Sequence, residues 1–152
     1  MEYNIRIGVM EDDARVKELY QELLNTVYPN DAVPGYGDNY LDDYFDEVGE
    51  DICFIAECDG KVIGYVTVQI MRMTSGDYGY IDDISVTEEY RSKGVGSMLI
   101  ARAENYITKL NINEVFLHVE QSNLKAKKLY ERLGFKEYRM DGNRHCMNKL
   151  FA

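Results

Sequence analysis

The chain has 152 residues and a net charge of −10, a length that fits one domain with a sizeable core. Apolar residues make up 45% and charged residues 29%, a balance that is ordinary for a globular protein and too apolar for disorder. The acidic excess argues against a nucleic-acid partner, because phosphate binding needs a basic surface. We expect one domain over residues 1–152.

The sequence also lacks the signals of a membrane, secreted or metal-binding protein. No run approaches the roughly 18 apolar residues of a membrane span, and the first residues lack the build of a signal peptide. The few potential metal ligands are scattered and lack metal-site spacing: Cys53, Cys58, Cys146, His118 and His145. They indicate buried structural thiols and no metal site. We expect a cytoplasmic protein with no membrane contact.

The charges are unevenly distributed along the chain. Between Lys17 and Lys61 there are twelve acidic residues and no lysine or arginine, whereas Arg91 to Arg144 holds 11 basic and 6 acidic residues. We therefore expect one part of the molecule to attract cations and another to attract anions.

The first half of the chain is predicted to form a strand, a helix, a loop, a short acidic helix and a hairpin. In chain order these are residues 4–9, a helix from Asp12 or Asp13 to Val27, residues 29–39, residues 40–48, and residues 52–57 with 62–73. Either aspartate can cap the first helix, whose apolar residues keep helical spacing. Asp59-Gly60 is a strong signal for the turn of the hairpin.

The second half is predicted to form a strand, a helix, a strand, a helix and a final pair of strands. In chain order these are residues 78–86, 94–110, 115–119, 123–134, and 135–140 with 145–151. Asn123 can cap the last helix and Gly134 can end it. The order indicates a mixed α+β fold with six or seven strands and helices on both faces of the sheet.

Arg91-Ser92-Lys93-Gly94-Val95-Gly96 lies between a predicted strand and a predicted helix. A helix N-terminus offers unpaired N–H groups and the positive end of its dipole, and glycines let a phosphate approach the backbone. Arg91 and Lys93 add positive charge. The pattern is neither a P-loop nor Gly-x-Gly-x-x-Gly. Alone, it also fits a tight turn with solvated charges.

In its context, the run from Ile81 to Gly96 resembles the acetyl-CoA-binding motif of the Gcn5-related N-acetyltransferases (GNAT). Farther along, Asn123 and the run Leu129 to Phe135 resemble that superfamily's second signature. The resemblance covers residues 52–150 well, the first helix loosely and residues 29–51 not at all. It implies an N-acetyltransferase with acetyl-CoA as co-substrate, and a GNAT-type acyl-CoA N-acyltransferase fold whose sheet is splayed between its fourth and fifth strands.

The resemblance also implies where acetyl-CoA binds. The pantetheine arm would lie in the splay and pair with the backbone of Ile84, Ser85 and Val86. The pyrophosphate would be held by Arg91, Ser92, Lys93, Gly94, Val95, Gly96 and Ser97. Asn123 would contact the pantetheine or a bridging water. The basic residues of the following helix either neighbour the 3′-phosphate or form a solvated face: Lys125, Lys127, Lys128 and Arg132.

The chemistry requires an acid and a base. An alkyl amine has a pKa of about 10 and must lose a proton before it attacks a thioester. Backbone N–H groups can stabilise the oxyanion that forms, and the leaving thiolate benefits from a proton donor. Tyr130 lies where similar enzymes place that donor beside the cofactor. It also fits a core aromatic on the apolar face of its helix.

The base has three candidates, and a water chain is a further alternative. Asp82 and Asp83 lie on the strand where polyamine-acetylating relatives carry acidic residues, and alternation along a strand predicts that at most one faces the amine. His118 lies where N-terminal-acetylating relatives carry a glutamate, and imidazole is a suitable base near neutral pH. It also fits a lone strand histidine. We rank Asp83 first, Asp82 second and His118 third.

The acidic stretch falls where the family places the roof of the acceptor site. A negative surface there would attract cationic amines, so we expect a polyamine- or aminoglycoside-like acceptor. A solvated acidic surface is the alternative. The competing functions are a protein N-terminal or lysine acetyltransferase and a non-catalytic acyl-CoA-binding regulatory module. Relatives also suggest a homodimer, with residues 135–151 as its contact.

Overall fold

The computed structural model describes residues 2–151, and its seven strands form one sheet in the order β1-β2-β3-β4-β5-β7-β6. The strands are β1 Tyr3–Ile7, β2 Ile52–Cys58, β3 Lys61–Met71, β4 Tyr78–Val86, β5 Glu114–Glu120, β6 Lys136–Asp141 and β7 Arg144–Leu150. β4 and β5 are parallel, and the other neighbours are antiparallel. The predicted mixed class is confirmed, with seven strands.

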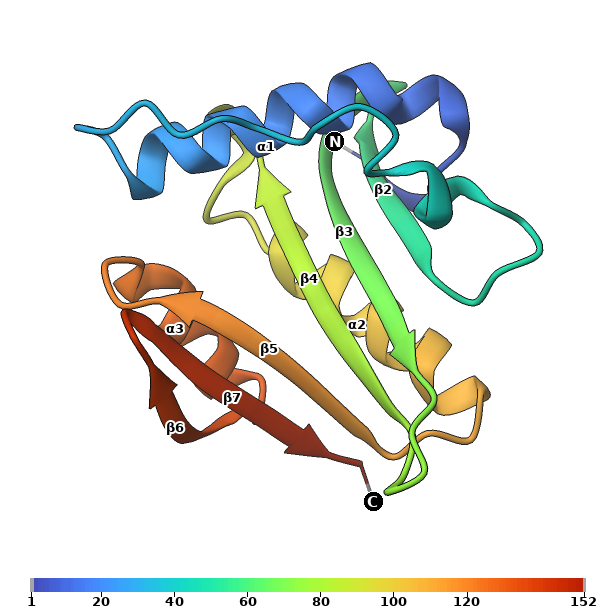
Figure 1. Cartoon of the computed structure of the whole chain (residues 1–152). Coiled ribbons are helices and arrows are strands. Elements are labelled where there is room, and N and C mark those ends of the chain that lie inside the picture. The colour runs from blue at the N-terminus through green and yellow to red at the C-terminus, as the bar shows by residue number, and fades with distance from the viewer. Residues whose placement is uncertain (1, 152) are drawn as a thin grey trace.

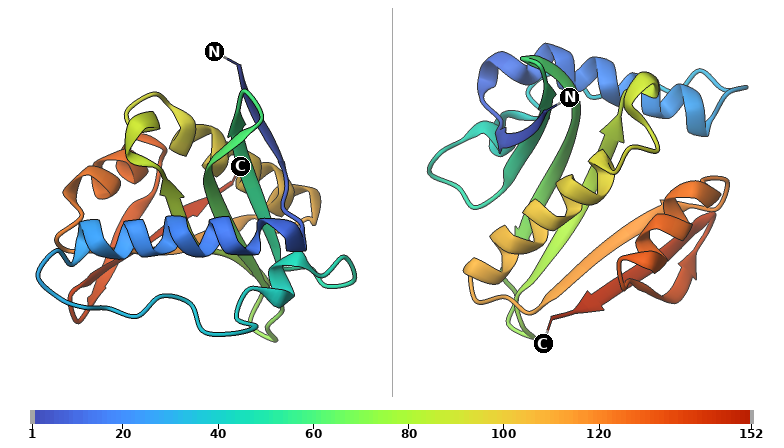
Figure 2. Two further views of the ribbon diagram at one scale, coloured as in Figure 1. Left: turned by 90° about the horizontal axis from the view of Figure 1, so that it is seen from above. Right: turned by 180° about the vertical axis from the view of Figure 1, so that it is seen from behind.

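Helices cover both faces of this sheet, as expected. The α-helices are α1 Asp13–Val27, α2 Val95–Lys109 and α3 Leu124–Arg132, and the 3-10 turns are η1 Met10–Asp12, η2 Asp42–Phe45 and η3 Glu88–Tyr90. Figure 1 and Figure 2 show α1 and the loop after it on one face, and α2 and α3 on the other. The order of elements follows the sequence-based expectation.

The expectation of an acidic helix at residues 40–48 is wrong, because only the single turn η2 forms there. Leu41 and Tyr44 are buried three residues apart, while Asp42 and Asp43 are exposed. This spacing is satisfied by one 3-10 turn, and the exposed acidic residues after it have no apolar partner that would extend the turn into a helix.

Two apolar cores hold the layers together. The smaller core joins α1 to the sheet and to the segment around η2: Val16, Leu19, Leu41, Tyr44, Cys53, Ile55 and Tyr65. The larger core lies under α2 and α3 on the opposite face. Gly79 allows α2 to pack closely, since a Cβ there would lie 2.5 Å from Ile107. Cys53, Cys58 and Cys146 are buried and free, as expected.

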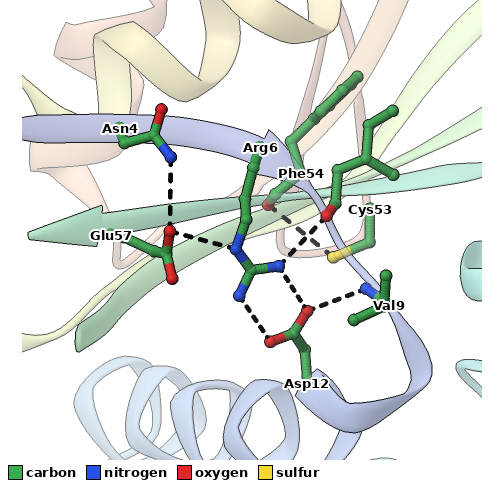
Figure 3. Close-up of polar contacts among 8 residues, drawn as sticks. Asn4, Arg6, Val9, Asp12, Cys53, Phe54 and Glu57 are labelled. Atoms are coloured by element: carbon green, nitrogen blue, oxygen red, sulfur yellow. Dashed lines mark hydrogen bonds and ion pairs between the residues drawn. The ribbon is translucent and has the colours of Figure 1, made fainter. Parts of the chain in front are cut away.

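An ion pair at the start of α1 fastens this helix to the edge of the sheet (Figure 3). Arg6 donates two hydrogen bonds to the Asp12 carboxylate, at 2.8 and 2.9 Å, and also contacts Glu57. The Val9 N–H donates to the same Asp12 carboxylate at 2.9 Å. Asp12 therefore does not cap α1 with its side chain, because Arg6 and the preceding turn occupy its oxygens.

The sheet is splayed between β4 and β5, as predicted. The two strands pair only at Gly79 with Val115, Tyr80 with Phe116 and Ile81 with Leu117, and Figure 1 shows them diverging beyond this point. Within residues 2–151, no helix has the length and apolar character needed to cross a bilayer. The cytoplasmic location and the homodimer stay predictions.

Candidate active site

A cavity of about 270 Å³ lies at the splay, where α1, β4, β5 and α3 meet. It is lined by side chains from α1, β4, β5, α3 and the beginning of β7. Six of the residues that the sequence singled out line this cavity: Asp82, Asp83, Ile84, His118, Asn123 and Tyr130. Segments that are far apart in the sequence therefore meet at this site.

A β-bulge in β4 places two carboxylates on one face of the sheet. Thr67 of β3 pairs with Asp83 and Val68 pairs with Ile81, which leaves Asp82 as the extra residue. The buried Thr67 hydroxyl accepts a hydrogen bond from the Asp83 N–H at 3.0 Å and so stabilises the bulge. The expectation that only one aspartate could face the amine is wrong, because alternation breaks at a bulge.

Three tyrosine hydroxyls from the loop after α1 and from η2 hold these carboxylates. Tyr36 donates a short hydrogen bond to Asp83. Tyr44 and Tyr40 donate to Asp82 Oδ2, at 2.8 and 3.1 Å. The segment of residues 29–51, in which the sequence motifs gave no resemblance, thus contacts the candidate base directly and forms a roof over it.

Aromatic stacking supports this roof. The ring of Tyr36 stacks on Tyr20 of α1 with centroids 3.8 Å apart, and on Tyr40 with centroids 4.7 Å apart. Burial followed by the charges of the nearby aspartates raises the pKa of Tyr20 to about 12. Burial also raises the pKa of each of the three donors, Tyr36, Tyr40 and Tyr44, so these phenols stay protonated at neutral pH and remain hydrogen-bond donors.

Asp83 has the pKa expected of a general base near neutrality. Burial, and next the negative charge of Asp82, raise its pKa to about 7, while the hydrogen bond from Tyr36 lowers it. No ion pair among residues 2–151 involves either aspartate. Such a perturbed carboxyl in a cavity is typical of a functional group.

His118 lies on the cavity wall opposite β4. The Tyr80 hydroxyl lies 3.0 Å from His118 Nδ1, and the two rings meet edge to face. Burial, followed by the positive charge of Arg144, lowers the pKa of His118 below its usual value. The imidazole is thus neutral at physiological pH and able to accept a proton.

The position of Tyr130 fits both interpretations that the sequence left open. It is only 5% exposed and packs its ring edge-on against Phe135, so it belongs to the core. It also lines the cavity. Burial raises the pKa of its hydroxyl, which keeps the proton on the oxygen. Tyr130 therefore keeps its proton at neutral pH and stays the predicted donor for a leaving group held in the splay.

The turn at residues 91–96, called the phosphate turn for the site that the sequence predicts there, leads directly into a helix as expected. α2 begins at Val95, with Gly94 before it in a left-handed conformation at φ +84°. Among residues 2–151, no side chain caps this helix terminus, so its first N–H groups point outward unoccupied by the protein. A glycine at this position avoids the strain that a Cβ would bring.

The side chains of the turn are partly engaged. Lys93 is exposed, and its Nζ donates to the Glu89 carbonyl at 3.0 Å. The Arg91 guanidinium donates from Nε to the Val86 carbonyl at 2.8 Å and from Nη2 to Glu22 at 3.1 Å. Arg91 thus has two protein partners already.

The remaining cofactor candidates lie along the splay. Since β5 pairs no residue of β4 after Ile81, the edge of Ile84–Val86 that faces β5 has no strand partner. The Ser85 hydroxyl donates to the Leu19 carbonyl of α1 at 3.1 Å. Asn123 caps α3, as predicted, by accepting the Ala126 N–H at 3.3 Å. Within residues 2–151, no cluster of side chains could hold a metal ion.

Sequence reasoning missed several residues of the site, notably Thr67 and Tyr80. Thr67 is recognisable only once the register of β3 against the bulge is known. Tyr80 contacts a strand that lies 38 residues away in the sequence. Neither has a local pattern that could have identified it.

The splayed sheet, the open helix terminus and the cavity between them define an acyl-CoA N-acyltransferase fold. The model of the Acetyltransferase (GNAT) family matches residues 16–135, which include the segment of residues 29–51. An uncharacterized N-acetyltransferase of Methanocaldococcus jannaschii is 30% identical over 137 residues, which are 90% of this chain and 80% of that protein. The chain belongs to the acetyltransferase (GNAT) family, a class of enzymes that takes the acetyl group from acetyl-CoA.

Two other similarities describe its relatives. An N-alpha-acetyltransferase of Sulfurisphaera tokodaii is 35% identical over 96 residues, which cover 57% of this chain and 58% of that protein. The structure of the PaiA N-acetyltransferase from Thermoplasma acidophilum in complex with coenzyme A has a TM-score of 0.81 at 22% identity, covering 99% of this chain and 100% of that one. The fold prediction is thereby confirmed.

Proposed function

We propose that this acetyltransferase transfers the acetyl group of acetyl-CoA to a cationic primary amine, with a polyamine- or aminoglycoside-like amine as the acceptor. One observation carries the proposal. The bulge turns Asp82 and Asp83 to the same face, inside a cavity, with hydroxyl partners but no cationic partner among residues 2–151. A bound ammonium would supply the positive charge that this carboxylate pair lacks.

The residues of the cavity divide the proton transfers between them. Ionised Asp83 takes a proton from the bound ammonium, and the free amine attacks the thioester carbonyl. As the C–N bond forms, the C–S bond breaks and Tyr130 gives its proton to the leaving sulfur. The nitrogen then loses its second proton to the Tyr130 oxygen, which restores the hydroxyl and leaves a neutral amide and a thiol, and Asp83 passes the first proton to solvent. Asp82 stabilises the cation before transfer, and neutral His118 offers a second acceptor for the proton.

The donor is held along the splay and at the start of α2. The pantetheine amides form hydrogen bonds with the backbone edge of Ile84–Val86 to which no strand is paired. The pyrophosphate accepts hydrogen bonds from the open N–H groups that follow Gly94, and Asn123 lies where the arm enters the cavity. The carbonyl oxygen then faces β4, where backbone N–H groups stabilise the oxyanion.

The N-terminal amine of a peptide is the second candidate acceptor. The likeness to an N-alpha-acetyltransferase favours it. The two acceptor classes share the primary ammonium that the aspartates bind, and they differ in the groups that adjoin it. A polyamine presents further charges to the acidic roof, whereas a peptide presents an uncharged backbone.

A thiol-release assay with acetyl-CoA tests the proposal. Diamines and polyamines, aminoglycosides and short peptides are compared at low and moderate ionic strength. We expect release with cationic small amines and a Michaelis constant that increases with salt. Turnover of peptides alone would assign the second candidate. Binding of coenzyme A without release for any amine would indicate a regulatory module, and no binding at all would overturn the proposal. D59N, in the exposed hairpin turn, serves as the control for D83N, the variant that removes the proposed base.

A further inference from the structure

Glu22 of α1 reaches across to the segment that leads into the phosphate turn. Its Oε1 accepts the Glu88 N–H at 2.9 Å and Nη2 of Arg91 at 3.1 Å. Its Oε2 accepts the Thr87 hydroxyl at 3.1 Å. One carboxylate thus holds three groups that lie at least 65 residues farther along the chain.

These contacts fix both ends of η3, the turn between β4 and the phosphate turn. Thr87 precedes η3 but does not cap it with its own hydroxyl. Glu22 takes that place by accepting the Glu88 N–H, which is the first free donor of the turn. At the other end, Arg91 is held between Glu22 and the Val86 carbonyl. The start of the phosphate turn is therefore tied to β4 directly through Arg91, and to α1 through Glu22.

The same helix also forms a wall of the acceptor cavity. Tyr20 and Leu23, on either side of Glu22, both line that cavity. Glu22 is only 32% exposed, whereas Glu18, one turn earlier on the helix, is 67% exposed and among residues 2–151 forms an ion pair only with Arg15 of the same helix. The contacts of Glu22 are thus specific to its position on α1.

We propose that Glu22 is a positioning residue for the pyrophosphate of acetyl-CoA, and that it acts through Arg91 and the Glu88 N–H. The inference rests on the proposed function, because it needs acetyl-CoA at this turn. A carboxylate repels a pyrophosphate, so Glu22 does not bind it directly. It places the turn, and Arg91 braces that turn between α1 and β4 and leaves the pyrophosphate to the backbone N–H groups.

Two acyl donors separate this role from a general structural one. S-acetylpantetheine carries the same thioester as acetyl-CoA but lacks the pyrophosphate and the nucleotide. For E22Q we expect KM for acetyl-CoA to increase by about 5- to 20-fold, with kcat changed by less than about twofold. With S-acetylpantetheine, kcat/KM should stay within about twofold of wild type. E18Q, the matched control, should leave the kinetic constants for both acyl donors unchanged.

A double-mutant cycle tests the path of the effect. If Glu22 acts through Arg91, E22Q should add little to R91Q, and R91Q alone should show the same dependence on the donor. Equal losses with both donors, or no loss with either, would overturn the inference. If E22Q does not fold, R91Q decides in its place. Failure of the proposed function differs from all of these, because wild type itself would then release thiol from acetyl-CoA with peptides alone or with none of the amines.

Discussion

Asp12 and Asp83 are two aspartates of one chain that are held in opposite ways. Asp12 accepts two hydrogen bonds from Arg6, and this contact lowers its pKa. Asp83 accepts a tyrosine hydroxyl, and burial raises its pKa to about 7. The first carboxylate has its counter-charge within the protein, so it stabilises the fold. The second has none among residues 2–151, and under the proposed function an ammonium substrate supplies that counter-charge.

The largest expected effect comes from replacing Asp83, the carboxylate that has no cationic partner among residues 2–151. D83N keeps the shape of the side chain but cannot take a proton, so kcat/KM should fall by about 10²- to 10³-fold. In wild type, kcat/KM should increase with pH through about 7, since Asp83 must be ionised to act as the base. The variant should lose this step, as measured in a pH–rate profile.

Two results would contradict this assignment. Retention of the step near pH 7 in D83N would transfer the role to His118 or to a water. An equal loss of activity in D59N would show that the effect is not specific to the cavity.

The sequence predicted those parts of the molecule that depend on local signals. The Asp59-Gly60 turn needs only two residues with positive φ, which are +52° and +79°. The turn before α2 likewise needs only two residues with positive φ, Ser92 at +60° and Gly94 at +84°, and its place before an amphipathic helix. Both are written in a few adjacent residues, and the order of strands and helices followed from the same kind of signal.

The bulge and the roof could not be predicted in this way. The position of Asp82 depends on how β3 pairs with β4, and a single extra residue reverses the side-chain pattern. The contacts of Tyr36 and Glu22 join groups that are 47 and 69 residues apart in the chain. Such contacts arise from tertiary packing, for which one sequence has no periodic signal.

The variant R6M, to be compared with D83N, leaves Asp12 without its cationic partner Arg6. R6M keeps much of the packing of the arginine stem, but it leaves a buried carboxylate with one hydrogen bond from the Val9 N–H. We expect a loss of stability on the order of 2 kcal/mol at pH 7, measured by urea unfolding. Below about pH 4 the loss should shrink, because Asp12 is then protonated in the unfolded chain. Unaltered stability at pH 7 would contradict the role of this pair.

D83N should have the opposite effect on stability. A carboxyl whose pKa is raised by folding favours the folded state below its unfolded pKa of about 4, and this contribution is lost as the pH rises through about 7. At pH 8, D83N should therefore unfold at higher urea than wild type, by a free energy on the order of 1–2 kcal/mol. The gain should vanish near pH 4. A destabilised variant at pH 8 would mean that another group neutralises Asp83.

The smallest expected effect concerns the hydroxyl that now takes the place of a counter-charge. Y36F retains the ring that stacks on Tyr20 and Tyr40 but removes the hydrogen bond to Asp83. Because that bond lowers the pKa of Asp83, its loss should move the step in the pH–rate profile upward by about 0.5–1 pH unit. Y138F removes a hydroxyl from an exposed ring on β6 and should leave the profile unchanged. An unmoved step in Y36F would mean that the roof shapes the cavity without tuning the base.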